Sequence, residues 1–404
     1  MSNTLSSSSP TSSKNNESNF VVPQSFRDAF ACHLYMLYTI MVFTESEIKA
    51  NKALGNTGGG SIGGRKNNNS NKREKERKIE ADQIQQLREA CASAMLTATN
   101  TMADNSSTLW KRGVPDENAV GLPCRISYLM LENATGVVAR KLASGDLALK
   151  MIATTIDSVD SLVNTIVAAL VDLLHSFDHV AKLVSELCCI VSKSSENKLS
   201  IELLREIGRL DVNMSTVSSE AGGKASGIRN IAPLINELAE KKPKLVLENI
   251  GLVLPHLQSE PYNLRSAIVT AIGHILIKSM NDENDEDQEL PEESEFEGSS
   301  SSRSLKKSMA EQKSHLFDIL VERTRDVSSY TRVAVLKTWA NLIESQILPL
   351  NRLIPVTELA IDRLQDKTVM VRRSAMQVCN VCDLKSFPKN DIPVFTLRYL
   401  SHRF

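Results

Sequence analysis

Two pairs of Asp and Arg residues have the spacing that best fits a defined chemistry. Asp326 lies six residues before Arg332, and Asp366 lies six residues before Arg372. In a helical hairpin this spacing places the carboxylate at the turn, where it accepts hydrogen bonds from the free N–H groups that begin the second helix. It also places the arginine within that helix, close enough to bridge neighbouring repeats. We therefore predict that these four residues form a structural ladder.

Other reactive side chains fit catalysis or metal binding poorly. The sequence has no Gly-rich phosphate loop, no HExxH and no GxSxG motif. His175 and His179 share a helical face, but a zinc site needs three or four ligands. Cys379 and Cys382 form a single CxxC without a second pair, so we interpret them as small buried side chains. We expect no catalytic residue, no cofactor and no metal.

The Asp and Arg pairs belong to a helical pattern that occurs twice, forty residues apart. The first copy begins at Leu316 and the second at Val356, each with apolar residues at i, i+3, i+4 and i+7 spacing. Such a period is typical of stacked helical hairpins. A third, weaker copy places Arg265 where Arg332 stands, and an acidic insertion explains its larger separation. The predicted fold class is an all-α solenoid.

Composition supports this class and limits the compartment. Of the 404 residues 42% are hydrophobic and only 4% aromatic, which suits stacked helices better than a sheet. Seven cysteines without a secretory leader indicate reduced thiols in the cytosol or nucleus. The longest apolar run, Phe30 to Phe43, is too short to cross a bilayer. We therefore expect no membrane association.

Changes in composition divide the first half of the chain. Residues 1–22 are rich in Ser and Asn and should be disordered. Residues 23–50 predict one amphipathic helix, 51–78 a flexible basic linker, and 79–217 an N-terminal helical domain. The basic run at Lys72–Lys78 fits nuclear import or nucleic-acid binding, but its alternation with Glu fits a solvated first helical turn better.

The second half has its own predicted segments. Residues 218–227 form a flexible join, 228–280 a repeat-like unit, and 313–388 two full repeats before an irregular tail at 389–404. Between the repeats, 281–312 should be a disordered acidic insertion, because Asp282 to Glu297 holds ten acids and no base. It is either a solubilising loop or an acidic interaction or phosphorylation segment.

The forty-residue unit with this Asp and Arg resembles a HEAT repeat. Several phrases, covering about half of the chain, are similar to the HEAT-repeat subunit 1 family of condensin: LWKRGVPDENAVGLPCRISYLMLEN, ELAEKKPKLVLENIGLVLPHLQSEPYNLRSAIVTAIGHILIK, DILVERTRDVSSYTRVAVLKTWANLIESQILPL and RLIPVTELAIDRLQDKTVMVRRSAMQV. Since that family continues for several hundred residues more, we expect an N-terminal portion, a truncated form or an imperfect gene model. The resemblance implies a HEAT-repeat α-solenoid.

The resemblance also implies a function. It suggests a non-enzymatic subunit that binds the kleisin chain, associates with the SMC ATPase subunits and DNA, and helps to condense mitotic chromosomes. We expect it in the nucleus and on chromosomes, and in the cytoplasm for part of the cell cycle, with no small-molecule substrate. Arg363, Lys367 and Arg373 are candidates for contacts with DNA or an acidic partner, the alternative being solvated surface. A generic HEAT-type transport or scaffold receptor, and the HEAT front end of a large kinase, remain alternatives.

Overall fold

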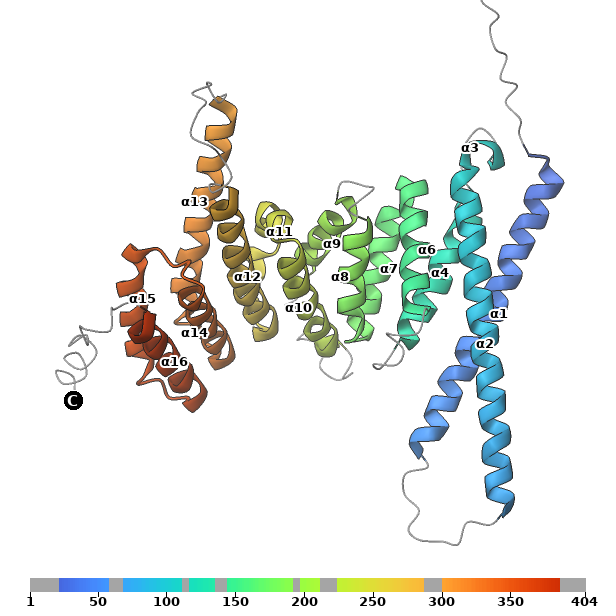
Figure 1. Ribbon diagram of the computed structural model, residues 1–404, viewed down its shortest axis with the longest axis horizontal. Coiled ribbons are helices and arrows are strands. Elements are labelled where there is room, and N and C mark those ends of the chain that lie inside the picture. The colour runs from blue at the N-terminus through green and yellow to red at the C-terminus, as the bar shows by residue number, and fades with distance from the viewer. Residues whose placement is uncertain are drawn as a thin grey trace, which may run out of the picture.

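The chain folds into a row of helices (Figure 1), seen here in a computed structural model of the protein. The structure describes residues 22–57, 68–110, 116–134, 144–191, 197–210, 224–286 and 300–385. Regular secondary structure in these ranges is helical throughout. The predicted all-α solenoid class is confirmed.

The first half of the row begins with two long helices. The helices that follow are shorter, and a 3-10 turn, η2, separates two of them. Their bounds are α1 (Gln24–Thr57), α2 (Asn68–Asp104), α3 (Ser106–Leu109), α4 (Glu117–Asn133), α6 (Ser144–Ser158), η2 (Asp160–Leu162), α7 (Val163–Ser176), α8 (Val180–Val191) and α9 (Lys198–Arg209).

The second half contains the repeats that carry the predicted ladder. Two 3-10 turns, η4 and η5, lie between α11 and α12. The bounds are α10 (Lys224–Lys241), α11 (Pro243–Asn249), η4 (Ile250–Leu252), η5 (Leu254–Gln258), α12 (Tyr262–Glu286), α13 (Ser300–Arg323), α14 (Ser329–Glu344), α15 (Leu350–Arg363) and α16 (Val369–Lys385).

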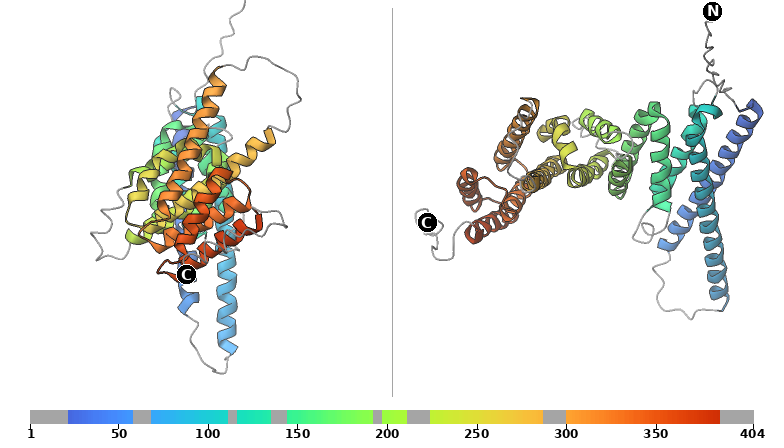
Figure 2. Two further views of the ribbon diagram at one scale, coloured as in Figure 1. Left: turned by 90° about the vertical axis from the view of Figure 1, so that its left-hand side faces the viewer. Right: turned by 45° about the horizontal axis from the view of Figure 1, so that its top comes forward.

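Helices stack on their neighbours along the chain. The main contacts run from α1 to α2 and α4, then through α6, α8, α10, α12 and α14 to α16. The right-hand view in Figure 2 shows an elongated row that has α1 and α2 at one end and α16 at the other, and the left-hand view looks along this row. One continuous hydrophobic cluster, from Leu34 to Cys382, runs through the row. The helices therefore bury their apolar faces mainly between adjacent layers, as in other repeat proteins.

Local sequence explains where α4 begins. Asp116 is the N-cap residue, and its side chain accepts a hydrogen bond from the Asn118 N–H at 3.0 Å. A carboxylate at this position satisfies a free donor and interacts favourably with the helix dipole. The buried face that follows includes Val120, Ile126 and Met130. It packs on α1 and α6.

A buried polar contact ties α1 to α2 and α4. Glu45 is 3% exposed, and its carboxylate pairs with Arg88 of α2. Its second oxygen accepts from Asn133 Nδ2 of α4 at 2.6 Å. Because both carboxylate oxygens have donors, the buried charge is satisfied by helices that lie far apart in sequence.

Two interruptions of the helices have local causes in the sequence. The apolar stripe from Ile152 to Leu174 is buried, but η2 interrupts it between α6 and α7. The run Ser158, Val159, Asp160, Ser161 has low helix propensity, which explains the break. In the repeat-like unit, residues 250–258 form 3-10 turns rather than a helix, because Pro255 removes a backbone donor.

Three predicted flexible segments are shorter than expected. The predicted linker at 51–78 begins within α1 and ends within α2, and the predicted join at 218–227 overlaps the start of α10. The predicted acidic insertion at 281–312 overlaps the end of α12 and the start of α13. Lys, Leu, Met, Ala, Glu and Gln in the overlap with α13 are good helix formers. Residues 1–21, 58–67, 211–223, 287–299 and 386–404, where the rest of the predicted disorder, linker, join, insertion and tail falls, lie outside the described residues. Within the described ranges, no helix has the length and apolar character needed to span a membrane.

Candidate functional site

The predicted ladder residues lie where the second helices of two consecutive repeats, α14 and α16, begin, and Arg265 lies at the corresponding place in α12. Arg265 of α12 donates to both carboxylate oxygens of Asp326, with Nε and Nη2 each at 3.1 Å. The same carboxylate accepts from the Ser328 N–H at 2.8 Å, at the entrance to α14. One aspartate thus closes its own turn and binds the preceding repeat. We refer to each such Arg–Asp contact as a rung.

The second rung repeats this geometry one layer further on. Arg332 of α14 donates to both oxygens of Asp366, through Nε at 2.9 Å and Nη2 at 3.0 Å. Asp366 also accepts from the Thr368 N–H at 2.9 Å, at the entrance to α16. The side chains of Arg332 and Asp366 are only 7% and 4% exposed. Two-pronged contacts of this kind fix orientation as well as distance.

The third nitrogen of each guanidinium binds the loop of its own repeat. Arg332 Nη1 donates to the backbone oxygens of Asp326 at 2.7 Å and Val327 at 3.1 Å. Arg372 Nη1 donates in the same way to the backbone oxygens of Asp366 at 2.8 Å and Lys367 at 3.2 Å. The residues spaced by six therefore meet through a backbone carbonyl. The carboxylate partner of Arg332 belongs to the next repeat.

Two further arginines flank the rungs. Arg323 Nη1 lies 3.6 Å from Asp326 Oδ2, and Arg363 Nη1 lies 3.9 Å from Asp366 Oδ2. Both occur three residues before the aspartate, so the forty-residue period could have identified Arg323 as a rung neighbour. Arg363, a candidate for contacts with DNA or an acidic partner, faces this carboxylate and is only partly exposed.

Electrostatics favour the charged form of Asp366. Burial by itself raises the pKa of this carboxyl, but the hydrogen bonds from Arg332 and the Thr368 N–H, with the charges of Arg332 and Arg363, outweigh burial. The net effect is a pKa below the ordinary value of 3.8. The rung is therefore an ion pair at neutral pH.

The other two candidate contact residues point to solvent. Lys367 lies in the loop before α16, and Arg373 lies in its first turns, and both are exposed. Neither is a member of a rung. Their ammonium and guanidinium groups are thus available at the surface edge on which the repeat loops lie.

Residues considered for metal chemistry have other surroundings. His179 Nε2 lies 2.9 Å from the Leu131 backbone oxygen, and burial lowers the pKa of His175. Cys379 and Cys382 are buried in α16, and Cys382 Sγ lies 3.3 Å from Thr357 Oγ1. Across the described ranges, no three His, Cys, Asp or Glu side chains are grouped closely enough to hold a metal ion.

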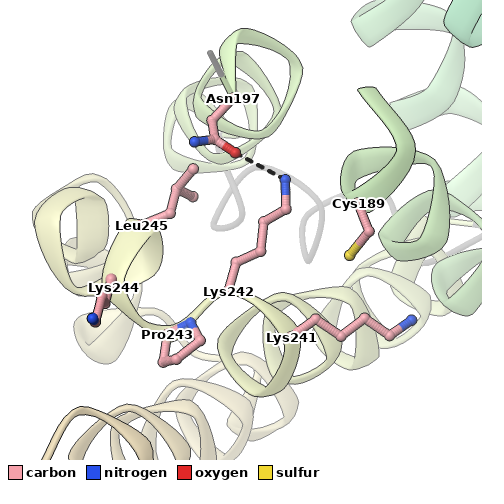
Figure 3. A pocket seen from close by; sticks show the side chains of 7 residues that line it. All are labelled: Cys189, Asn197, Lys241, Lys242, Pro243, Lys244 and Leu245. Carbon is pink, nitrogen blue, oxygen red and sulfur yellow. Dashed lines mark hydrogen bonds between the residues drawn. The ribbon is translucent and has the colours of Figure 1, made fainter. Parts of the chain in front are cut away.

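A recess between α8, α9 and α11 is a second place where charged side chains gather (Figure 3). It has a volume of about 470 Å³ and includes Lys241, Lys242 and Lys244 in its lining. Lys242 Nζ donates to the Cys188 backbone oxygen, to Asn197 Oδ1 at 3.0 Å and to Ser200 Oγ at 3.3 Å.

These contacts use all three donors of the Lys242 ammonium group. Figure 3 shows Lys242 reaching toward Asn197, whereas Lys241 and Lys244 extend in other directions. Burial lowers the pKa of Lys242. Lys242 therefore connects α8 and α9 to the start of α11, and we assign it a structural role.

Stacked helical pairs with an Arg–Asp rung between layers define the protein as a HEAT-repeat α-solenoid. The family model described as sister chromatid cohesion protein PDS5 matches residues 141–404, which is more than half of the chain. The chain belongs to this family. The match includes α6 to α16 and both rungs.

Similar curated proteins are condensin subunits. The chain is 31% identical over 283 residues to Condensin-1 complex subunit CAP-D2 of Arabidopsis thaliana, a match that covers 69% of this chain and 18% of that protein. It is 25% identical over 287 residues to Condensin complex subunit 1 of Xenopus laevis, covering 71% and 19%. For the Homo sapiens subunit the identity is 23% over 271 residues, covering 67% and 17%.

These matches confirm the resemblance to condensin subunit 1 that the sequence phrases indicated. The chain spans less than a fifth of the length of these relatives. The identities are low enough that individual contacts must be argued from this chain's own residues.

Proposed function

We propose that this chain is a non-enzymatic HEAT-repeat subunit of the condensin complex. In this proposal it binds the kleisin chain, associates with the SMC subunits and DNA, and contributes to mitotic chromosome condensation. The observation that carries the proposal is the similarity to condensin subunit 1 from plant, frog and human over about two thirds of the chain. We propose location in the nucleus and on chromosomes, with a cytoplasmic phase in the cell cycle.

The architecture is consistent with this role. A solenoid whose layers contact mainly their neighbours presents a long surface, and such surfaces suit the binding of extended segments. We propose that the rungs hold adjacent layers in register, so that residues on different repeats keep a constant separation. The ladder residues Asp326, Arg332, Asp366 and Arg372 are in this proposal structural, and partners bind elsewhere.

Co-purification from mitotic extract tests the proposal. The tagged chain should recover the kleisin and both SMC subunits of condensin, detected by immunoblotting and by mass spectrometry. A second tagged chain, in which Arg332 and Arg265 are changed to Ala, should recover less of them if the layers must stay in register. Recovery of folded cargo or a small GTPase without SMC subunits would instead favour a transport receptor.

We propose Arg363, Lys367 and Arg373 as contacts with DNA or with an acidic partner. The exposure of Lys367 and Arg373 supports this role, while Arg363 is partly engaged by Asp366. If DNA is the partner, Lys367→Ala should weaken duplex binding and lower its salt dependence by about one counterion. Lys150→Ala, at an exposed lysine of α6, is the matched control. If Lys367→Ala and Arg373→Ala both bind duplex DNA as the wild type does, these residues do not contact DNA, and an acidic partner is the remaining proposal.

A further inference from the structure

The loop edge of the last two repeats exposes apolar side chains beside basic ones. Val327 precedes α14 and is 94% exposed, and Tyr330 in the first turn of α14 is 52% exposed. Val369 and Met370, in the first turn of α16, are 59% and 45% exposed. We call these four residues, with Lys367 and Arg373, the loop ridge.

The rungs bring the two halves of the loop ridge together. Arg332 near the start of α14 binds Asp366 in the loop before α16, so the first turns of these helices lie side by side. Figure 1 shows α14 and α16 adjacent at one end of the row. Tyr330 and Met370 occupy equivalent positions of the forty-residue repeat, so their backbones are separated by roughly one helix-to-helix spacing, about 8–10 Å for packed helices.

The tyrosine is held in place. Its ring stacks on that of Tyr262, in the first turn of α12, with centroids 4.7 Å apart and planes inclined by 17°. Ser266 and Thr331 hydroxyls lie 3.3 Å apart one residue further along α14. A positioned aromatic ring loses little conformational freedom when it forms a contact, which makes it a good anchor for a partner.

Charge defines the kind of partner. The loop ridge contains two basic residues and no acidic residue. Lys367 follows the rung aspartate, and Arg373 lies three residues after Met370, on the same side of α16. An occupant would therefore need acidic side chains for the bases and apolar side chains for Val327, Tyr330, Val369 and Met370.

We propose that the loop ridge binds an extended acidic peptide segment with apolar side chains, supplied by the kleisin chain. This inference rests on the proposed function and adds a position and a chemistry to it. A peptide in the polyproline II conformation advances about 3.1 Å per residue with three residues per turn, so two apolar side chains three residues apart point the same way and span roughly the distance between neighbouring helices. The segment should therefore carry apolar residues at that spacing, flanked by Asp or Glu.

Duplex DNA fits the loop ridge less well. Phosphates would pair with Lys367 and Arg373, but they offer nothing to four exposed apolar side chains. Burying such side chains stabilises a complex in proportion to the apolar area removed from water. A peptide can contact both the basic and the apolar side chains of the loop ridge, whereas DNA can pair only with the basic ones.

The inference can be tested with overlapping peptides that together cover the condensin kleisin of the same organism. Fluorescence anisotropy measures the affinity of each labelled peptide for the full chain. Acidic peptides with the apolar spacing above should bind, and added salt should weaken them. Val327→Asp with Met370→Asp should lower their affinity by about tenfold or more, as expected for central anchors. Lys367→Glu with Arg373→Glu should do the same.

Matched variants elsewhere provide the control. Leu350→Asp with Lys337→Glu changes an 84% exposed leucine and an exposed lysine outside the loop ridge, and should leave peptide affinity unchanged. Circular dichroism should show that all variants are folded. Equal affinity in wild type and loop-ridge variants, or binding only of neutral or basic peptides, would overturn the inference.

Two further outcomes separate this inference from the proposed function. If intact kleisin co-purifies equally with wild type and with the loop-ridge variants, the kleisin binds elsewhere and only the inference is wrong. If wild type recovers neither kleisin nor SMC subunits, the proposed function fails as well. If the loop-ridge variants lose affinity for duplex DNA but for no peptide, the surface is a nucleic-acid site.

Discussion

Arg332 shows why arginine suits the rung. Its guanidinium binds a carboxylate of the next repeat with two nitrogens and two loop carbonyls of its own repeat with the third. A lysine has one nitrogen and could not reproduce this planar, two-sided geometry. The residue thus joins a turn and an interface at one buried point.

The first prediction concerns this side chain. Arg332→Ala should lower the free energy of unfolding by about 2 kcal/mol or more, because it leaves the Asp366 carboxylate buried without its main partner. Urea denaturation measures the change. Arg325→Ala, at an exposed arginine in the adjacent loop, should be nearly neutral. Similar midpoints for wild type and Arg332→Ala would show that the rung does not stabilise the fold.

The second prediction follows from the lowered pKa of Asp366. The folded state binds this proton more weakly than the unfolded chain, so the stability it contributes is present above pH 3.8 and is lost as the pH falls through the lower folded value. Asp366→Asn should therefore cost about 2 kcal/mol near neutral pH and progressively less below pH 3.8. Unfolding measured in parallel at each pH gives this difference, and a difference that does not change with pH would contradict the ion pair.

At the scale of elements, close backbone approach limits which residues fit between layers. A Cβ added at Gly208 of α9 would overlap the Leu252 backbone oxygen of η4. A Cβ added at Gly121 of α4 would meet nothing within 4 Å. Both glycines lie in helices, so the two positions differ mainly in what lies opposite them.

The third prediction uses this contrast. Gly208→Ala should destabilise the protein by about 1–3 kcal/mol, because α9 and η4 must separate to admit the methyl group. Gly121→Ala should be neutral or stabilising by up to about 1 kcal/mol, since alanine favours the helix. Thermal unfolding of the two variants measures both effects, and equal destabilisation would mean that the contact between α9 and η4 is not responsible.

At the scale of the whole molecule, the layers stack along one direction, so a change in one layer affects mainly the layers next to it. The principal contacts of α16 are with α14 and α15, whereas α7 and α8 contact helices nearer the middle of the row. Stability in such a row is approximately the sum of repeat and neighbour contributions. Loss of one rung should therefore destabilise mainly the two layers that it joins.

The fourth prediction tests this locality. In Arg332→Ala, amide hydrogen exchange should increase in α15 and α16 and stay unchanged in α7 and α8. Exchange followed by mass spectrometry resolves these segments. A uniform increase from α1 to α16 would indicate that the chain unfolds as one cooperative unit and that the rungs act globally.

The sequence by itself determined the helical class, the forty-residue period and the residue types of the ladder. Apolar spacing and a repeated Asp and Arg depend on local geometry, which one chain reveals. The tertiary structure decided that Arg332 pairs with Asp366 rather than with the carboxylate of Asp326, because that choice depends on how one layer stacks on the next. Stacking also decided which side chains remain outside, and it left Val327, Tyr330 and Met370 exposed together at the edge formed by the repeat loops.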